Sequence, residues 1–425
     1  MRGPEEQLKI KGKPLGRDFS IFWFGQAISV MGTAFTQYGL PLLVFRLTGS
    51  ALNLAFGQVS IYLPYVLFGL FIGAWTDRID RKKMLVRVNV LRGLVIALIP
   101  VLALLQGLNV YWIYIISFLN SVLAVFSGAA TAAVVPSLVE KDQLVTANGR
   151  ISITDSIAKV VGPVVAGLLV TFAPLETVFL IDGLSFFVIA GSLLFIKASF
   201  NPARTGNNPK EKNVLKEIQE GLVFVRNQTV LLSATILATL INLLMITAAT
   251  QQIILVKRQF QATDQQVSLM FAAGGIGAII FSFLVSRIPK RWGFGRIAIG
   301  SQMISGGLVL ALGSVPIFEM ALVLMVFIAG LGIVFNIQFN SLVHFLVPNQ
   351  LLGRVTSTIL VLAFVSVPIG SLGGGSLIEW TGKVGLVYQV IGILVIVTTI
   401  IFTFTPLNRP QNFAPVASKE VAKPL

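Results

Sequence analysis

The sequence predicts an all-α membrane protein with twelve transmembrane helices in two pseudo-symmetric six-helix bundles. Three observations support this prediction. Only 12% of the residues are charged and 55% are hydrophobic, whereas soluble proteins carry about 25% charged residues. Long apolar runs alternate with short polar turns along the chain, and motifs of the first half recur in the second.

Each apolar run has about the 20 residues that a helix needs to cross a bilayer. The runs lie near 19–45, 51–75, 85–106, 110–135, 151–173, 176–197, 230–255, 266–287, 294–315, 317–347, 355–380 and 383–406. Because an unpaired backbone is costly in lipid, we expect each run to form a helix.

An internal repeat divides these helices into two halves. Gly149–Thr154 recurs as Gly353–Thr358, and Val135-Pro136 recurs as Val347-Pro348. Two halves of the same orientation, related by an axis along the membrane normal, are typical of secondary transporters.

The predicted domain organisation follows from this division. It comprises a tail (1–18), a six-helix bundle (19–197), a linker (198–229), a second six-helix bundle (230–406) and a tail (407–425). Within the linker, Leu215, Ile218 and Leu222 share one helical face, and Lys216 and Glu220 share the other. We expect this amphipathic helix to lie on the inner membrane surface; a solvated tether is the alternative.

The cations fall on one side of the predicted membrane. Of the 32 Lys and Arg residues, only Arg46, Lys257, Arg258 and Lys383 lie in loops on the other side. The positive-inside rule then predicts a multi-pass protein of the cell membrane with both termini cytoplasmic. The net charge of +15 therefore indicates contact with anionic membrane lipids rather than with nucleic acid.

The sequence offers no chemistry of an enzyme. It has no Cys, a single His and no glycine-rich phosphate loop ending in Lys-Ser or Lys-Thr. We therefore expect no catalytic residues, no cofactor and no metal ion, and nothing indicates an obligate protein partner.

The charged turn between the second and third apolar runs carries the most specific motif. Its residues Gly73, Asp77, Arg78, Arg81, Lys82 and Leu85 match the pattern Gly-x-Leu-Ala-Asp-Arg-x-Gly-Arg-Lys-x-x-Leu. The turn thus resembles the signature of the major facilitator superfamily. Asp80 in place of Gly resembles the variant of the macrolide and siderophore exporter branch.

The resemblance implies a cytoplasmic gate. In the superfamily, the aspartate of this motif latches the two halves together near the start of the eleventh helix, where this chain has Arg354. We therefore expect Asp77 to pair with Arg354, with Arg78, Arg81 and Lys82 as further gating residues. Arg150 is related to Arg354 by the repeat. The alternative for both arginines is anchoring to lipid headgroups.

The fifth apolar run resembles the antiporter signature Gly-x-x-x-Gly-Pro-x-x-Gly-Gly of the superfamily. Ala158, Gly162, Pro163, Ala166 and Gly167 occupy its positions. Proline bends a helix, and small residues allow a close neighbour, so we expect a sliding or hinge interface here, with ordinary small-residue packing as the alternative.

Two carboxylates inside apolar runs are candidates for proton coupling, because ionisable groups in a membrane are costly. Asp155 lies one turn before Lys159, which offers mutual neutralisation as an alternative role, and Asp182 lies within the sixth run. Drug exporters of this kind carry an arginine in the fourth helix, where this chain has only Asn120 as a strongly polar residue.

The resemblance also implies a substrate cavity lined by helices 1, 4, 7 and 10. The candidate lining residues are Gln26, Thr33, Gln37, Asn120, Asn242, Asn336 and Asn340. Neutral polar groups in apolar walls suit an amphipathic small molecule, and hydrogen bonds between helices are their competing use.

Taken together, the chain is expected to export a hydrophobic or amphipathic small molecule, of the drug, macrolide or siderophore type, by alternating access and in exchange for protons. The alternatives are an uptake permease or a lysophospholipid flippase of the same fold, or a membrane sensor that transports nothing.

Overall fold

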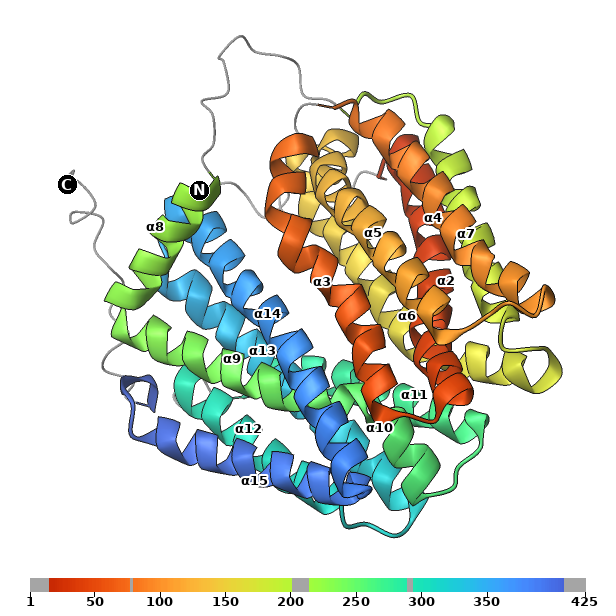
Figure 1. The fold of residues 1–425 in the computed structure, drawn as a ribbon. Helices are drawn as coiled ribbons and strands as arrows, with labels where there is room; N and C mark the ends of the chain where they lie inside the picture. Colours follow the sequence, from red (N-terminus) through yellow and green to blue (C-terminus); the bar gives the residue numbers. More distant parts are fainter. Residues whose placement is uncertain (1–14, 77–78, 201–213, 289–292, 409–425) are drawn as a thin grey trace. The chain divides into compact units, whose positions relative to one another are not determined.

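The computed structural model describes residues 15–76, 79–200, 214–288 and 293–408. Within these ranges, twelve helices are long and apolar enough to cross a membrane, which confirms the predicted fold class (Figure 1).

The membrane-spanning helices of the first half are α2 (Arg17–Thr48), α3 (Ala51–Thr76), α4 (Arg81–Leu104), α5 (Val110–Leu138), α6 (Leu144–Phe172) and α7 (Thr177–Leu194). Those of the second half are α9 (Thr229–Thr250), α11 (Asp264–Leu284), α12 (Phe294–Leu312), α13 (Phe318–Leu346), α14 (Asn349–Thr381) and α15 (Val384–Thr403). Short helical segments lie between them: η1 (Lys141–Gln143), α10 (Gln252–Ile254), the π-helical η2 (Leu255–Gln259) and η3 (Val285–Arg287). A further short segment, η5 (Pro406–Asn408), follows α15.

Polar residues set several helix ends. The Asp80 side chain caps α4, and Asn109 caps α5. Thr263 and Gln266 form a reciprocal capping box at the start of α11. At the end of α14, Gly382 takes a φ of 66°, which glycine adopts without strain.

The chain forms two compact units. The first combines the described parts of residues 1–39 and 67–210, and the second combines residues 40–66 with the described parts of 211–425. In the first unit α4 packs against α5 and α7, and in the second α12 packs against α13 and α15. The end of α2 and the first part of α3 thus belong to the second unit.

The surface of the bundles is apolar. Leu104, Phe172 and Trp380 are 84%, 89% and 85% exposed. Large exposed apolar side chains on so many helices are unfavourable in water and favourable in lipid. The protein is therefore a multi-pass membrane protein.

The linker contains helix α8 (Val214–Asn227). It packs against α14 and α9 in the second unit, as Figure 1 shows. At Gly221 an added Cβ would lie 2.6 Å from the carbonyl oxygen of Arg354, so glycine allows the two helix backbones to touch.

Candidate functional site

Asp182 is the most deeply buried carboxylate of the described chain that lies within a membrane span. Its side chain is 1% exposed on α7. Thr36 of α2 donates a hydrogen bond to Oδ2 at 2.6 Å, while Thr33 and Ser185 donate longer ones to Oδ1 at 3.5 and 3.4 Å. Gly32 allows this approach, because an added Cβ would lie 2.9 Å from Oδ1.

Arg92 of α4 supplies a positive charge to the same region, and its charge acts on the Asp182 carboxylate. Its Nε donates to Oδ1 of Asn120 on α5 at 3.0 Å, and its Cζ lies 4.1 Å from the centre of the Phe186 ring, within the range of cation–π attraction. A Cβ added at Gly93 would lie 2.9 Å from the carbonyl oxygen of Gly183. Backbone contact between two glycines therefore brings α4 and α7 together beside Arg92.

Two cations of the signature turn, Arg81 and Lys82, bind within the first unit. Arg81 donates to the carbonyl oxygen of Phe200 at 3.3 Å, and Lys82 Nζ donates to that of Ile196 at 2.7 Å. Both carbonyls lie on the segment that follows the end of α7 at Leu194. Asp80, one of the residues that depart from the general signature, caps α4 by accepting from the Lys83 N–H at 3.1 Å.

Only Arg354 of the expected gate pair Asp77–Arg354 can be placed, because Asp77 and Arg78 lie outside the described residues. Arg354 is described, and it bonds Glu220 of the linker helix α8 with 2.5 Å between Nη1 and Oε2. The two side chains are 38% and 39% exposed. Arg354 therefore has a partner in its own unit.

Arg150, the repeat-related arginine, faces an aromatic ring instead of a carboxylate. Its Cζ lies 6.0 Å from the centre of the Trp23 ring. The Trp23 indole donates to Thr154 Oγ1 at 3.0 Å, so the start of α6 is tied to α2 near this arginine.

The antiporter-like segment is a tight helix contact. Ala158, Gly162, Pro163 and Gly167 are buried on α6. A Cβ added at Gly162 would lie 2.4 Å from the Cβ of Ala34 on α2, too close for any larger side chain without movement of the helices.

Asp155, the other proton-coupling candidate, differs from Asp182 in its surroundings. It is half-buried on α6, and the charge of Lys159 one turn later acts on it. Lys159 can thus neutralise the charge of Asp155, which is the alternative role predicted for this carboxylate.

Three of the predicted cavity residues bond other helices. Thr33 bonds Asp182 and Asn120 bonds Arg92, as described above. Asn242 of α9 donates to the Ala363 carbonyl at 2.9 Å and to Ser366 Oγ at 2.7 Å on α14. These contacts correspond to the competing role in helix packing.

The other four are accessible or bond their own helix. Gln37, Asn336 and Asn340 are exposed, and Gln26 is half-buried. Asn336 and Asn340 lie one turn apart on α13 and donate to carbonyls of the preceding turn at 3.0 and 2.9 Å.

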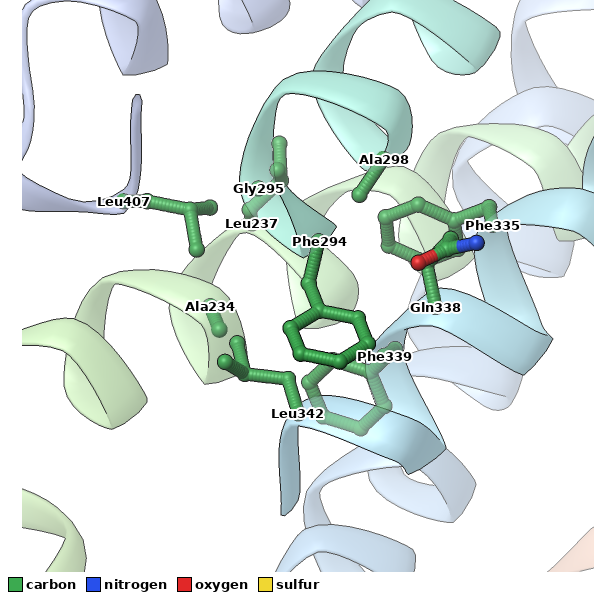
Figure 2. A pocket seen from close by; sticks show the side chains of 10 residues that line it. All are labelled: Ala234, Leu237, Phe294, Gly295, Ala298, Phe335, Gln338, Phe339, Leu342 and Leu407. Carbon is green, nitrogen blue, oxygen red and sulfur yellow. The ribbon is translucent and has the colours of Figure 1, made fainter. Parts of the chain in front are cut away.

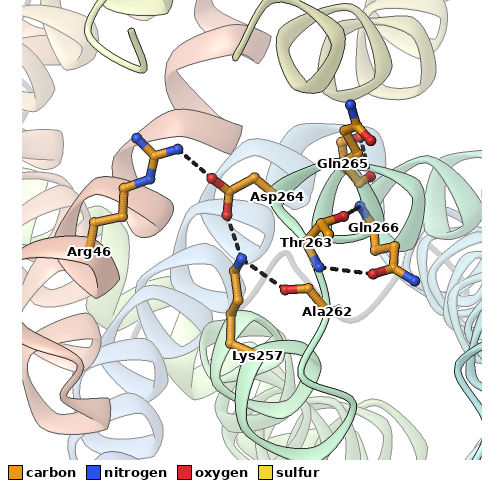
Figure 3. Close-up of polar contacts among 8 residues, drawn as sticks. Arg46, Lys257, Ala262, Thr263, Asp264, Gln265 and Gln266 are labelled. Atoms are coloured by element: carbon orange, nitrogen blue, oxygen red, sulfur yellow. Dashed lines mark hydrogen bonds and ion pairs between the residues drawn. The ribbon is translucent and has the colours of Figure 1, made fainter. Parts of the chain in front are cut away.

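A cluster that we call the Asp264 cluster, made of Arg46, Lys257 and Asp264, ties α2 to α11 and η2 (Figure 3). Asp264 bonds Arg46 on one side and Lys257 Nζ at 2.5 Å on the other. Lys257 also donates to the carbonyl oxygen of Ala262 at 2.9 Å.

A second carboxylate supports the same junction. Oε1 of Glu379, near the end of α14, accepts from the N–H of Ala51 at 2.6 Å, at the positive N-terminal end of α3. Gln251 donates to the Ala51 carbonyl at 3.0 Å, and Arg258 donates to that of Gly49 at 2.7 Å. The turn between α2 and α3 is thus held by polar contacts from α14, from Gln251 between α9 and α10, and from η2.

The apolar cavity in Figure 2 is too small to hold a substrate. It lies between α9, α12 and α13, has a volume of about 10 Å³ and is lined by Phe294, Phe335 and Phe339 among other side chains. That volume matches about one water molecule. Gln338, the one polar side chain shown there, is 8% exposed.

Sequence reasoning missed four residues that the structure places in contacts: Arg92, Glu220, Asp264 and Glu379. Arg92, Asp264 and Glu379 are ionisable residues within or beside an apolar run, which is the signal that marked Asp182. Glu220 lies on the polar face of the linker helix, where a charged residue is ordinary. Among the described residues, no group of His, Asp and Glu side chains is arranged to hold a metal ion.

Comparisons with known proteins agree with this architecture. Residues 13–425 match the model of a family described as transmembrane secretion effector. Macrolide efflux protein A of Streptococcus pyogenes is 29% identical over 224 residues, which cover 52% of this chain and 54% of that protein. The match thus spans only about half the length of that relative. The multidrug efflux pump Tap of Mycobacterium tuberculosis is 24% identical over 413 residues, which cover 93% and 94%.

Solved structures share the fold. The nucleoside transporter NupG superposes with a TM-score of 0.74 at 14% identity, covering 91% of this chain and 98% of that one. A bacterial homologue of the lysosomal transporter Spinster gives 0.69 at 13% identity, covering 95% and 97%. At these identities the likeness concerns the fold alone.

Proposed function

Because the chain belongs to the transmembrane secretion effector family of the major facilitator superfamily, we propose that it exports hydrophobic or amphipathic small molecules across the cell membrane in exchange for protons. The observation that carries this proposal is the match along nearly the whole chain to a protein named as a multidrug efflux pump. The partial match to a macrolide efflux protein supports a macrolide as the first substrate to test.

Alternating access requires that polar contacts at the two membrane faces break and re-form in turn. We assign the inner gate to Asp77 and Arg354, with Arg150 and the cations of the signature turn as its surroundings. The bond between Arg354 and Glu220 adds a second carboxylate that competes for the same guanidinium. In this proposal, α8 holds Arg354 while the inner gate is open and releases it to Asp77 on closure.

Hinge movement is assigned to α6. Gly162 and Pro163 combine a close contact to α2 with a missing backbone N–H. A helix that touches its neighbour through small residues and bends at proline can slide without repacking large side chains.

Proton coupling is assigned first to Asp182 and second to Asp155. The support for Asp182 is its burial among three hydroxyl donors and one cation. A carboxylate in such a site changes its contacts when it binds a proton, which gives the protein two arrangements to exchange.

Substrate contact is assigned to the amides that stay accessible: Gln37, Asn336 and Asn340, with Gln26. Their amides are neutral hydrogen-bond donors and acceptors, so they suit a bulky molecule without selecting for its charge. The apolar outer surface is the partner of membrane lipids.

The test is drug efflux by cells that lack their own pumps. Cells expressing the chain should resist erythromycin and lose accumulated ethidium faster than controls, and a protonophore should abolish this loss. Asp182→Asn should lose both phenotypes, whereas Glu319→Gln, at the first turn of α13, should keep them. Faster entry of either compound would instead favour uptake, and no change in either would favour a sensor.

Orientation has its own test. The chain has no Cys, so single cysteines in the tails report topology without background. We expect a cysteine at Ser418 to react with a membrane-impermeant maleimide only after the cells are opened; reaction in intact cells would place the C-terminus outside.

A further inference from the structure

The crossing of α4 and α7 contains two ionisable residues, Arg92 and Asp182, that helix packing does not require. The second unit contains the matching crossing of α12 and α15, where a Cβ added at Gly306 would lie 3.0 Å from the Gly392 carbonyl oxygen. This repeats the contact between Gly93 and Gly183 in the first unit. Both crossings therefore rest on a glycine pair in backbone contact.

The residues that precede these glycines differ between the two crossings. In the first unit they are Arg92 and Asp182, and in the second they are Ser305 and Ile391. Ser305 and Ile391 are 0% and 4% exposed, and Ser305 Oγ has no hydrogen-bond partner. The second crossing thus packs in the same way without any charge.

We propose that Arg92 is the positioning residue of the proton-coupling step: its charge favours the ionised form of Asp182, and it stays bound to Asn120 and Phe186 when Asp182 binds a proton. This inference rests on the proposed proton coupling. The inference goes beyond the proposed proton coupling because it names the cation that acts on Asp182 and separates the role of this cation from helix packing.

The contacts of Arg92 suit both states of Asp182. Asn120 Oδ1 and the face of Phe186 are neutral groups that attract a guanidinium whether or not the carboxylate is charged. Thr36 donates to the carboxylate and its hydroxyl oxygen can accept from a protonated carboxyl. Asp182 can therefore bind a proton without leaving Arg92 or Thr36 unpartnered.

The charged groups around Asp182 are few. From α2 it meets the hydroxyls of Thr33 and Thr36, and from its own helix that of Ser185. Arg92 is the charged group that acts on it among the described residues. A change at Arg92 should therefore act directly on the protonation of Asp182.

The experiment is pH-difference infrared spectroscopy of the full chain in proteoliposomes, which needs no substrate. We expect a carboxyl C=O band that is lost in Asp182→Asn. In Arg92→Gln it should appear at higher pH, because loss of the cation disfavours the carboxylate. Ser305→Ala, in the matching crossing, should leave the band unchanged. A band that persists in Asp182→Asn, or whose pH dependence is the same in Arg92→Gln, would overturn the inference.

A second variant separates coupling from packing. The double substitution Arg92→Ser with Asp182→Ile copies the second crossing. We expect it to unfold at nearly the wild-type temperature while proton release on erythromycin addition is lost. If the double variant unfolds at a much lower temperature, and the carboxyl band of Arg92→Gln has the same pH dependence as that of the wild type, then Arg92 and Asp182 serve to stabilise the fold instead. If the infrared result holds but erythromycin releases no proton from the wild type, the proposed substrate is wrong and the role of Arg92 stands.

Discussion

The Asp264 cluster makes a quantitative prediction about opening at the predicted outer face. Asp264 is 22% exposed and joins Lys257, which is 17% exposed, to Arg46, which is 41% exposed. Partly exposed ion pairs contribute about 0.2–1 kcal/mol each, so Asp264→Asn should remove about 1 kcal/mol from the closed junction. That free energy corresponds to a change of about fivefold in the population of the open junction.

Ala51 provides the site for the assay. It lies at the held turn and is 0% exposed, so Ala51→Cys in this cysteine-free chain reacts with an impermeant maleimide only when the junction opens. We expect Asp264→Asn to raise the labelling rate by about fivefold, and high salt to raise it in the wild-type background by screening the pairs. Glu319→Gln is the matched control, because it also removes a carboxylate but lies outside the Asp264 cluster.

The result that refutes this reasoning is an unchanged labelling rate in Asp264→Asn. An equal rise in Glu319→Gln would also refute it, because the effect would then reflect lost charge in general and not the cluster.

Two further sets of substitutions test the predicted inner gate and the hinge. Glu220→Gln should slow efflux only slightly, because a half-exposed ion pair contributes about 1 kcal/mol or less, whereas Arg354→Gln should abolish efflux. If efflux assays show equal losses for both variants, Glu220 and not Asp77 is the gating partner of Arg354. Gly162→Leu should lower the unfolding temperature and the efflux rate, since overpacking against Ala34 costs about 1–3 kcal/mol. Gly128→Ala is the control, because an added Cβ there meets nothing within 4 Å. It should leave both the thermal unfolding temperature and the efflux rate unchanged.

The helices could be predicted from sequence because lipid imposes a strong constraint. An apolar run of sufficient length must form a helix in a membrane, and all the predicted spans are present. The ends were less accurate. The helices predicted near 85–106 and 355–380 begin at Arg81 and Asn349, because their first turns lie beyond the apolar segments. The Asp80 side chain caps α4, whereas α14 begins directly after Pro348 without a side-chain cap.

The contacts between helices could not be predicted in the same way. Asp182 was identifiable as a costly buried charge, but nothing in its neighbourhood along the chain indicates Thr36 or Arg92. The same holds for Asp264, whose partner Arg46 lies far away in sequence. Such pairs depend on helix rotation and on glycine contacts, which a pattern of hydropathy does not encode.

The most direct test of proton-coupled export is erythromycin accumulation in inside-out vesicles under an imposed pH gradient. We expect vesicles with an acidic interior to accumulate erythromycin, and both a protonophore and Asp182→Asn to abolish the accumulation. Accumulation that is indifferent to the gradient, or that persists in Asp182→Asn, would contradict proton coupling through this carboxylate.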